Sequence, residues 1–198
     1  MKTPQAVATP AKPTYQGNDK LLLGIVLGVL TFWMFAGTVG TVARAILTDL
    51  NGGPIDEIAE PLISLNQMNL AVSITALFSG LFIVFMGGLA DRIGRVRIAV
   101  VGNMLGIAGS LLLVLAAGSA ALPMLLTGRA LQGLSAACIM PSTMALVKTY
   151  WDGAARQRAV SMWSIGSWGG SGIAALFGGF VATNYDWRVI FYMSIVVS

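Results

Sequence analysis

The chain alternates long apolar stretches with short charged segments. The first five apolar stretches each hold about 20 residues or more, which is the helix length that crosses the hydrocarbon core of a bilayer. The pattern predicts helices over residues 21–47, 66–90, 98–117, 121–150, 157–183 and 188–198. The last stretch would span only about 15 Å as a helix, so we expect the chain to be truncated within its sixth helix.

The composition favours lipid as the solvent. The chain is 56% hydrophobic and only 10% charged, whereas soluble domains carry roughly 25% charged residues. We therefore expect an all-α, multi-pass transmembrane helical bundle over residues 21–198, preceded by a polar tail at residues 1–20.

The residue inventory excludes several kinds of chemistry. The chain has no histidine, which excludes a His-ligated metal site and a histidine general base. The sequence has no phosphate-binding loop and no paired nucleophile and base, so we expect no enzyme activity, no metal and no cofactor. The net charge is +4, but the basic residues cluster between apolar runs, a pattern that sets membrane topology rather than nucleic-acid binding.

The basic residues predict the orientation. Nine of them fall on one side of the alternating helices: Lys2, Lys12, Lys20, Arg92, Arg95, Arg97, Lys148, Arg156 and Arg158. The other side carries only Arg44 and Arg188. The positive-inside rule places the nine, and the N-terminus, in the cytoplasm. We expect a multi-pass protein of the plasma (inner) membrane.

The segment between the second and third predicted helices, residues 87–97, carries the sharpest chemical pattern. Asp91 falls at the negative, C-terminal end of its helix, where a carboxylate needs a cationic partner. Gly94 permits the positive φ of a sharp turn. The segment is either a topological loop that ends the helix or a gate latch that forms and breaks. The candidate gate residues are Gly87, Asp91, Arg92, Gly94, Arg95 and Arg97.

A single arginine lies deep in the fourth predicted helix. Arg129 falls about 12 Å inside the outer end of this helix, and a central arginine costs about 2.5–3.5 kcal/mol on insertion. The side chain either snorkels to the interface or faces a cavity together with Gln132, which shares its helix face. No Asp or Glu falls within the five complete predicted helices.

Small residues recur every four positions in the fifth predicted helix. In lipid, such a stripe lets two helices approach closely. The stripe is either static packing or a seam that bends. Its members, with one flanking glycine, are Gly166, Gly170, Ala174, Gly178 and Gly179.

Two further patterns concern the first helix and an internal repeat. Trp33 and Phe35 either line an aromatic pocket or face lipid and neighbouring helices. The pair Gly87-Gly88 followed by Arg97 recurs three helices later as Gly178-Gly179 followed by Arg188. Copies separated by three helices have opposite membrane orientation, which is typical of the inverted repeats of transporters.

Three segments resemble signatures of the major facilitator superfamily. GGLADRIGRVR (residues 87–97) resembles its loop motif G-x-L-A-D-R-x-G-R-[KR], with Val96 in place of a basic residue. LLTGRALQGLSAA (residues 125–137) resembles its arginine motif l-x-x-x-R-x-x-q-G-x-g-a-a, with Ser135 replacing a glycine. The fifth helix resembles the antiporter motif G-x-x-x-G-P-x-x-G-G, with Ala174-Ala175 in place of Gly-Pro.

The resemblance covers nearly the whole chain from Asn18 onward. Within the superfamily, the chain resembles the multidrug:proton antiporter branch, the fourteen-helix exporters of the NorB and QacA types. It implies the N-terminal half of a 3+3 inverted-repeat fold, with the missing C-terminal half of the transporter as its partner. It also implies proton-coupled efflux of drugs or other small amphipathic compounds by alternating access, with the proton as coupling ion and membrane lipid as surroundings.

The resemblance further assigns roles to residues. Arg129, Gln132 and Gly133 would serve proton coupling or the substrate cavity, and Asp91 with its arginines would form the cytoplasmic gate. A proton-carrying acid would belong to the missing portion. Two alternatives stay open: a metabolite or organic-anion transporter of the same fold, and a truncated membrane protein that does not transport.

Overall fold

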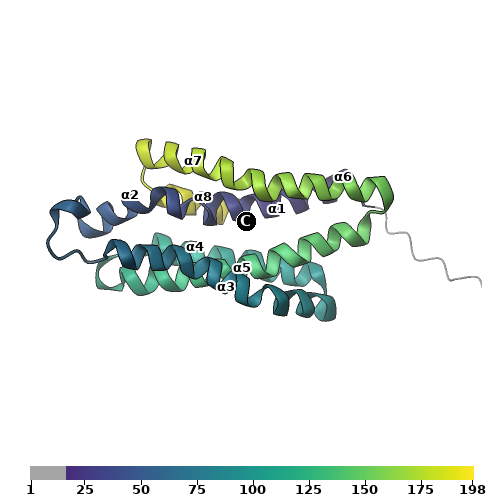
Figure 1. Cartoon of the computed structure of the whole chain (residues 1–198), viewed down its shortest axis with the longest axis horizontal. Coiled ribbons are helices and arrows are strands. Elements are labelled where there is room, and N and C mark those ends of the chain that lie inside the picture. Colours follow the sequence, from purple (N-terminus) through teal and green to yellow (C-terminus); the bar gives the residue numbers. More distant parts are fainter. Residues whose placement is uncertain (1–16) are drawn as a thin grey trace, which may run out of the picture.

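The computed structural model describes residues 17–198, except for the side chains of residues 34–36. Most of the predicted tail therefore lies outside the described residues. The described part contains helices and no strand (Figure 1). The α-helices are α1 (Asp19–Ala36), α2 (Val39–Asn51), α3 (Leu65–Ile93), α4 (Arg95–Val114), α5 (Ala121–Tyr150), α6 (Gly153–Ser164), α7 (Gly170–Asn184) and α8 (Arg188–Val197).

Four helical segments of the described chain are long and apolar enough to cross a membrane: Leu65–Ile93, Arg95–Val114, Gly118–Tyr150 and Gly153–Asn184. The last helix, α8, is a shorter apolar helix. The short helix η2 (Gly118–Ala120) leads directly into α5. The prediction of an all-helical, multi-pass bundle is confirmed.

The first predicted span is not one uninterrupted helix. It is divided into α1 and α2 at Gly37 and Thr38, where φ is −72° and −69°. Both residues keep right-handed helical angles, so α2 continues from α1 toward the same end of the bundle (Figure 1). Glycine and threonine are weak helix formers. The length of the apolar stretch does not reveal a break at such residues. The N-terminus of α1 is capped by Asn18, whose side chain accepts the Leu21 N–H at 2.8 Å.

The fifth predicted span is also interrupted. A π-helical turn, η3 (Ile165–Gly169), separates α6 from α7. The surrounding sequence is rich in glycine and serine, which weakens the ordinary helical hydrogen-bond ladder. Such π turns inside α-helices are frequent at functional sites. The predicted helix over residues 157–183 lies within the continuous helical segment Gly153–Asn184, but the apolar pattern did not predict this π turn.

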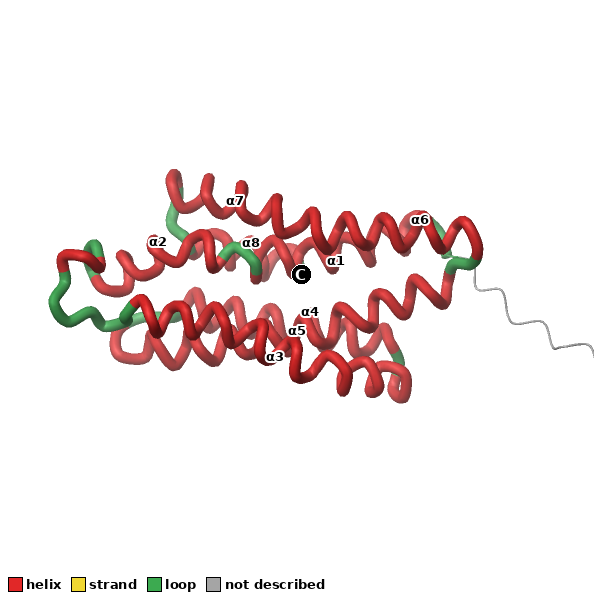
Figure 2. Tube along the Cα trace, viewed as in Figure 1, coloured by secondary structure: helices red, strands yellow, loops and turns green. Residues whose placement is uncertain are grey.

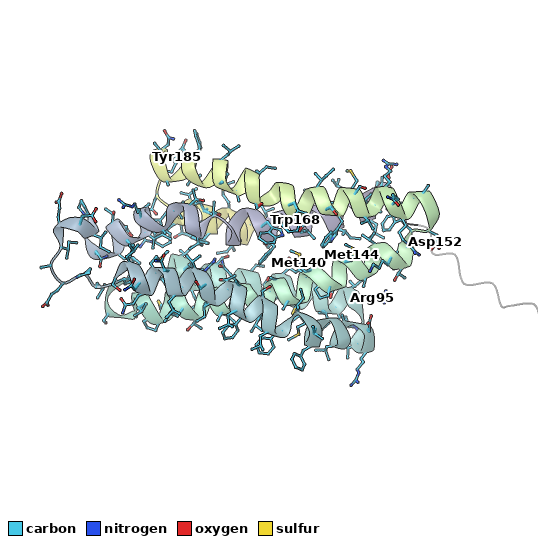
Figure 3. The ribbon with its side chains drawn as sticks, viewed as in Figure 1. Arg95, Met140, Met144, Asp152, Trp168 and Tyr185 are labelled. Carbon is cyan, nitrogen blue, oxygen red and sulfur yellow. The ribbon has the colours of Figure 1, made fainter. Side chains whose placement is uncertain are left out.

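The two ends of the bundle differ in charge. We call the end with residues 91–97 and 151–158 the basic end, and the end with residues 49–60 and 184–188 the acidic end. Figure 3 labels Arg95 and Asp152 at the basic end and Tyr185 at the acidic end. Figure 2 shows the long connection between α2 and α3, which contains the short helix η1 (Ile55–Glu57), at the acidic end.

The apolar core gathers toward the two ends. At the acidic end, buried residues of α2, α4, α5 and α8 form the largest cluster, among them Ile46, Leu113, Leu125 and Phe191. At the basic end, a smaller cluster joins α1, α5 and α6 around Trp151. Polar side chains and cavities lie in the middle of the bundle, and the candidate functional site is there.

Helices α4 and α5 pack at very close range. The built Cβ positions of Gly102, Gly106 and Gly109 would lie 2.8, 3.0 and 2.7 Å from atoms of Cys138, Ser135 and Gly128 in α5. Small residues at spacings of four and three allow this approach, as they do between helices in lipid generally. The contact makes α4 and α5 one unit that carries Arg129.

Candidate functional site

Arg129 is buried in the bundle. Its side chain is only 3% exposed. Its Nε donates to the Ala71 carbonyl of α3 at 3.2 Å, and its Nη1 donates to Gln132 Oε1 at 2.7 Å. The Thr75 hydroxyl in turn donates to the Arg129 carbonyl at 3.0 Å. Arg129 therefore points inward and does not snorkel.

A chain of hydrogen bonds continues from Arg129 to the last helix. Gln132 Nε2 donates to Ser110 Oγ in α4 at 3.4 Å, and the hydroxyls of Ser110 and Ser194 lie 3.1 Å apart. All four side chains are buried. The chain connects α5, α4 and α8 through the interior and includes a fixed positive charge, because an arginine keeps its proton in proteins.

Arg129 also lines a cavity of about 240 Å³ that α1, α2, α3 and α5 enclose. The remaining lining is mostly apolar or small: Phe32, Trp33, Gly37, Gly40, Val72, Thr75, Ala76, Ser79, Ala136 and Met140. Among these described residues, Arg129 is the ionisable one. A mostly apolar wall with a few polar groups is the usual composition of a small-molecule site.

Trp33 forms the aromatic wall of this cavity. Its indole Nε1 donates to Ser167 Oγ at 3.2 Å, inside the π turn η3. Its ring packs edge-on against Phe32, with centroids 5.6 Å apart. The structure thus brings the predicted Trp33 to the cavity, whereas the side chain of Phe35 lies outside the described residues. Trp168, by contrast, is exposed.

The small-residue stripe of the fifth span packs against the first. A Cβ at Gly166 would lie 3.0 Å from Val26, a Cβ at Gly170 would lie 2.9 Å from Trp33 Cβ, and a Cβ at Gly178 would collide with Thr38. Ala174 is buried in the same contact. Gly179 faces open space. The stripe therefore sets the distance between α7 and the helix that carries Trp33.

At the basic end, Arg95 joins the loop between α3 and α4 to α5. It forms an ion pair with Asp91 at 2.9 Å, donates to the Ala145 carbonyl at 3.0 Å and bonds the Thr149 hydroxyl. Gly94 has the predicted positive φ, +111°. Arg92 and Arg97 are exposed. Gly87 lies within α3, where a Cβ would be 3.4 Å from Pro141.

The sequence profile described as Major Facilitator Superfamily matches residues 21–198. The chain belongs to the major facilitator superfamily. The matched range includes residues 87–97, where Asp91 and Arg95 are paired as described above.

The chain is similar to curated drug-resistance proteins of this superfamily. It is 49% identical over 190 residues to "Quinolone resistance protein NorB" of Staphylococcus aureus strain MRSA252, and 48% identical to the protein of that name from strain bovine RF122 / ET3-1. In both comparisons the match covers 96% of this chain and 38% of the relative. The chain thus spans well under half the length of these relatives.

Solved structures support the fold. A bacterial homologue of the human lysosomal transporter Spinster, crystallised facing inward, matches with a TM-score of 0.69 and 21% identity, over 94% of this chain and 42% of that one. A peptide transporter of the POT type in complex with sulfate matches with a TM-score of 0.69 and 24% identity, over 92% of this chain and 37% of the other. The predicted N-terminal half of the superfamily fold is confirmed.

Within the superfamily motif around Arg129, the structure separates residues that sequence analysis grouped. Arg129 lines the larger cavity, whereas Gln132 lines a smaller one. Gly133 lines neither. A Cβ at Gly133 would lie 2.6 Å from the Thr75 carbonyl and 2.8 Å from Phe78 Cβ, so its place is the contact between α3 and α5.

Sequence analysis missed the ion pairs and hydrogen bonds that Arg188 makes at the acidic end. Arg188 forms ion pairs with Asp49 at 2.7 Å and with Asp186 at 3.5 Å. It also donates to the carbonyls of Val114 and Ala116 at the end of α4, at 3.3 and 3.5 Å. Asp49 is separated from it by most of the chain, so the only sequence signal was the weak repeat that pairs Arg97 with Arg188.

Replacing Arg95 by glutamine is expected to loosen the basic end. The substitution removes the ion pair to Asp91 and the charge-assisted bonds to α5, which together stabilise by about 1 kcal/mol after allowance for solvent screening. Cys138 is buried and is the single cysteine of the chain, so a thiol-reactive dye reports unfolding as the temperature rises. Arg95→Gln should lower the Tm by a few degrees.

The matched control for this experiment is Arg92→Gln, in the same loop. Arg92 is exposed, and its replacement removes an equal charge without removing an ion pair in the described structure. Its Tm should stay at the wild-type value. Equal Tm values for the Arg92 and Arg95 variants would contradict a stabilising role for the contacts of Arg95 with Asp91 and α5.

Proposed function

We propose that this chain forms the N-terminal bundle of a proton-coupled drug exporter that works by alternating access. The observation that carries the proposal is the buried Arg129 beside a largely apolar cavity with an aromatic wall. Such a lining suits small amphipathic compounds, whose apolar parts gain from leaving water. The similarity to quinolone resistance proteins supports the same substrate class.

The charge distribution supports a direction for the proposed exporter. The basic end would face the cytoplasm by the positive-inside rule. An inward proton gains about 2.3 kcal/mol per 100 mV of membrane potential, which can drive outward movement of a solute. Arg129 would contribute a fixed positive charge that tunes a titrating group or holds an anionic one, because its own guanidinium stays protonated.

Drug accumulation in cells tests this function. Cells that express the intact gene should hold less of a fluorescent quinolone than cells with an empty vector. The difference should disappear when an uncoupler collapses the proton gradient. Equal accumulation in both cell lines would contradict drug export, and a difference that survives the uncoupler would contradict proton coupling.

A second candidate function is transport of an organic-anion metabolite. It is favoured by the same cavity, in which Arg129 is the ionisable residue among those described and would attract a carboxylate. Uptake of organic anions without any change in quinolone accumulation would support this candidate over drug export.

A further inference from the structure

A second, smaller cavity lies next to the hydrogen-bond chain of Arg129. Its volume is about 20 Å³. Its polar lining comes from four helices and the residue after the last of them: Thr31 of α1, Asn103 and Ser110 of α4, Gln132 and Ser135 of α5, Ser194 of α8, and Ser198. Nothing in the proposed substrate path uses this cavity.

Two of the lining residues are buried, and their hydroxyls face the cavity without a protein partner. Thr31 is 7% exposed and Ser135 is 1% exposed. Within residues 17–198, neither hydroxyl makes a hydrogen bond to another protein group, although Gln132 and Ser110 beside them are bonded. A buried hydroxyl without a partner costs about 1–3 kcal/mol, so native proteins nearly always supply one.

The size and the lining fit one water molecule. A bound water needs a volume of about 10–15 Å³ or more and two to four polar partners, and this cavity offers both. A cation would fit poorly, because no Asp or Glu side chain lines the cavity and Gln132 is bonded to the positive charge of Arg129. We propose that the cavity binds an ordered water that bridges Thr31 and Ser135.

The water would lie beside the polar chain, because Gln132, Ser110 and Ser194 line the same cavity, and it would bring a fifth helix to that place. Arg129, Gln132, Ser110 and Ser194 already connect α3, α5, α4 and α8. Through the water, Thr31 adds α1, the helix that also carries Trp33 at the larger cavity. The hydrogen-bond chain of Arg129 and the helix of the aromatic wall thereby meet at one hydrated cavity.

Radiolytic footprinting of the wild-type chain in detergent tests the site. Hydroxyl radicals formed from a bound water oxidise the side chains that touch it, and Ile139 is buried and lines the small cavity. We expect clear oxidation of Ile139 in the wild type. Its absence would overturn the proposal, whatever the variants do.

The variant Gly106→Ala should displace the water from the small cavity. The added Cβ would lie 3.0 Å from Ser135 Oγ and would push this hydroxyl into the cavity. Oxidation of Ile139 should fall several-fold, whereas Met140, which lines the larger cavity, should be labelled as in the wild type. A parallel fall at both residues would indicate general loosening and would count against a separate water site.

A double-mutant cycle gives an independent readout. If Thr31 and Ser135 share one water, Thr31→Val and Ser135→Ala should each lower the Tm, and the double variant should lose little more than one of them. Ser142→Ala is the control, because Ser142 Oγ is buried without a partner and lines neither cavity. It should leave the Tm unchanged or raise it. Additive losses, or singles that behave like Ser142→Ala, would overturn the proposal.

Discussion

Replacing Arg129 by glutamine is expected to abolish transport in cells that express the intact gene. The substitution removes the positive charge at the cavity and leaves the Ala71 carbonyl and Gln132 Oε1 without their donor. Unpaired buried polar groups and a lost charge in a low-dielectric site each carry a large cost. Quinolone export, measured at equal protein abundance in the membrane, should fall at least tenfold.

Two further variants separate charge from geometry at this position. Arg129→Lys keeps the charge but loses the planar, forked donor set, so export should be weak but measurable. Arg44→Gln removes an arginine whose side chain is 83% exposed at the acidic end, and export should stay at the wild-type rate. Full export by Arg129→Gln would remove Arg129 from the mechanism.

The features that sequence analysis predicted well have strong local causes. A charge inside a long apolar helix is so costly that Arg129 had to be either at an interface or among polar partners, and its distance from the helix end favoured the second. Gly94 was predictable because a sharp turn between two helices needs a positive φ. The capping box of Ser64 and Gln67 that begins α3 also has a local cause, although sequence analysis did not name it.

The features that were missed depend on neighbours distant in sequence or on small backbone differences. The π turn η3 and the break at Gly37 change the helical hydrogen-bond pattern by one residue or two, which apolar periodicity does not record. Arg188 meets Asp49 only after the helices assemble. The motif resemblance grouped Gly133 with Arg129 and Gln132, but the position of α3 decides that it is a packing residue.

The contacts of Arg95 and Arg188 occupy corresponding places in the two inverted repeats of the fold. Arg95 lies in the loop after the second span and reaches the last turns of α5, the first helix of the second repeat. Arg188 lies after the fifth span and reaches Asp49 in the last turn of α2, which ends the first span of the first repeat. An arginine of each repeat therefore contacts the other repeat: Arg95 at the basic end and Arg188 at the acidic end.

Gly109→Val is expected to cause the largest loss of stability. A Cβ at Gly109 would lie 2.7 Å from the Gly128 carbonyl and 2.9 Å from Gln132 Cγ, and the first of these atoms is backbone that moves only with the helix. Overpacking of this kind costs about 3 kcal/mol, which corresponds to a fall in Tm of roughly 10 °C. The dye reaction of Cys138 measures it.

The control for Gly109 is Gly80→Val in α3, where a Cβ would have nothing within 4 Å. The two variants change the same residue type in helices of the same bundle, so they differ in the space available and not in helix propensity. Gly80→Val should unfold within about 2 °C of the wild type. If both variants unfold at the same temperature, the close contact between α4 and α5 does not stabilise the bundle. Other contacts would then have to keep α4 and α5 together as the unit that carries Arg129.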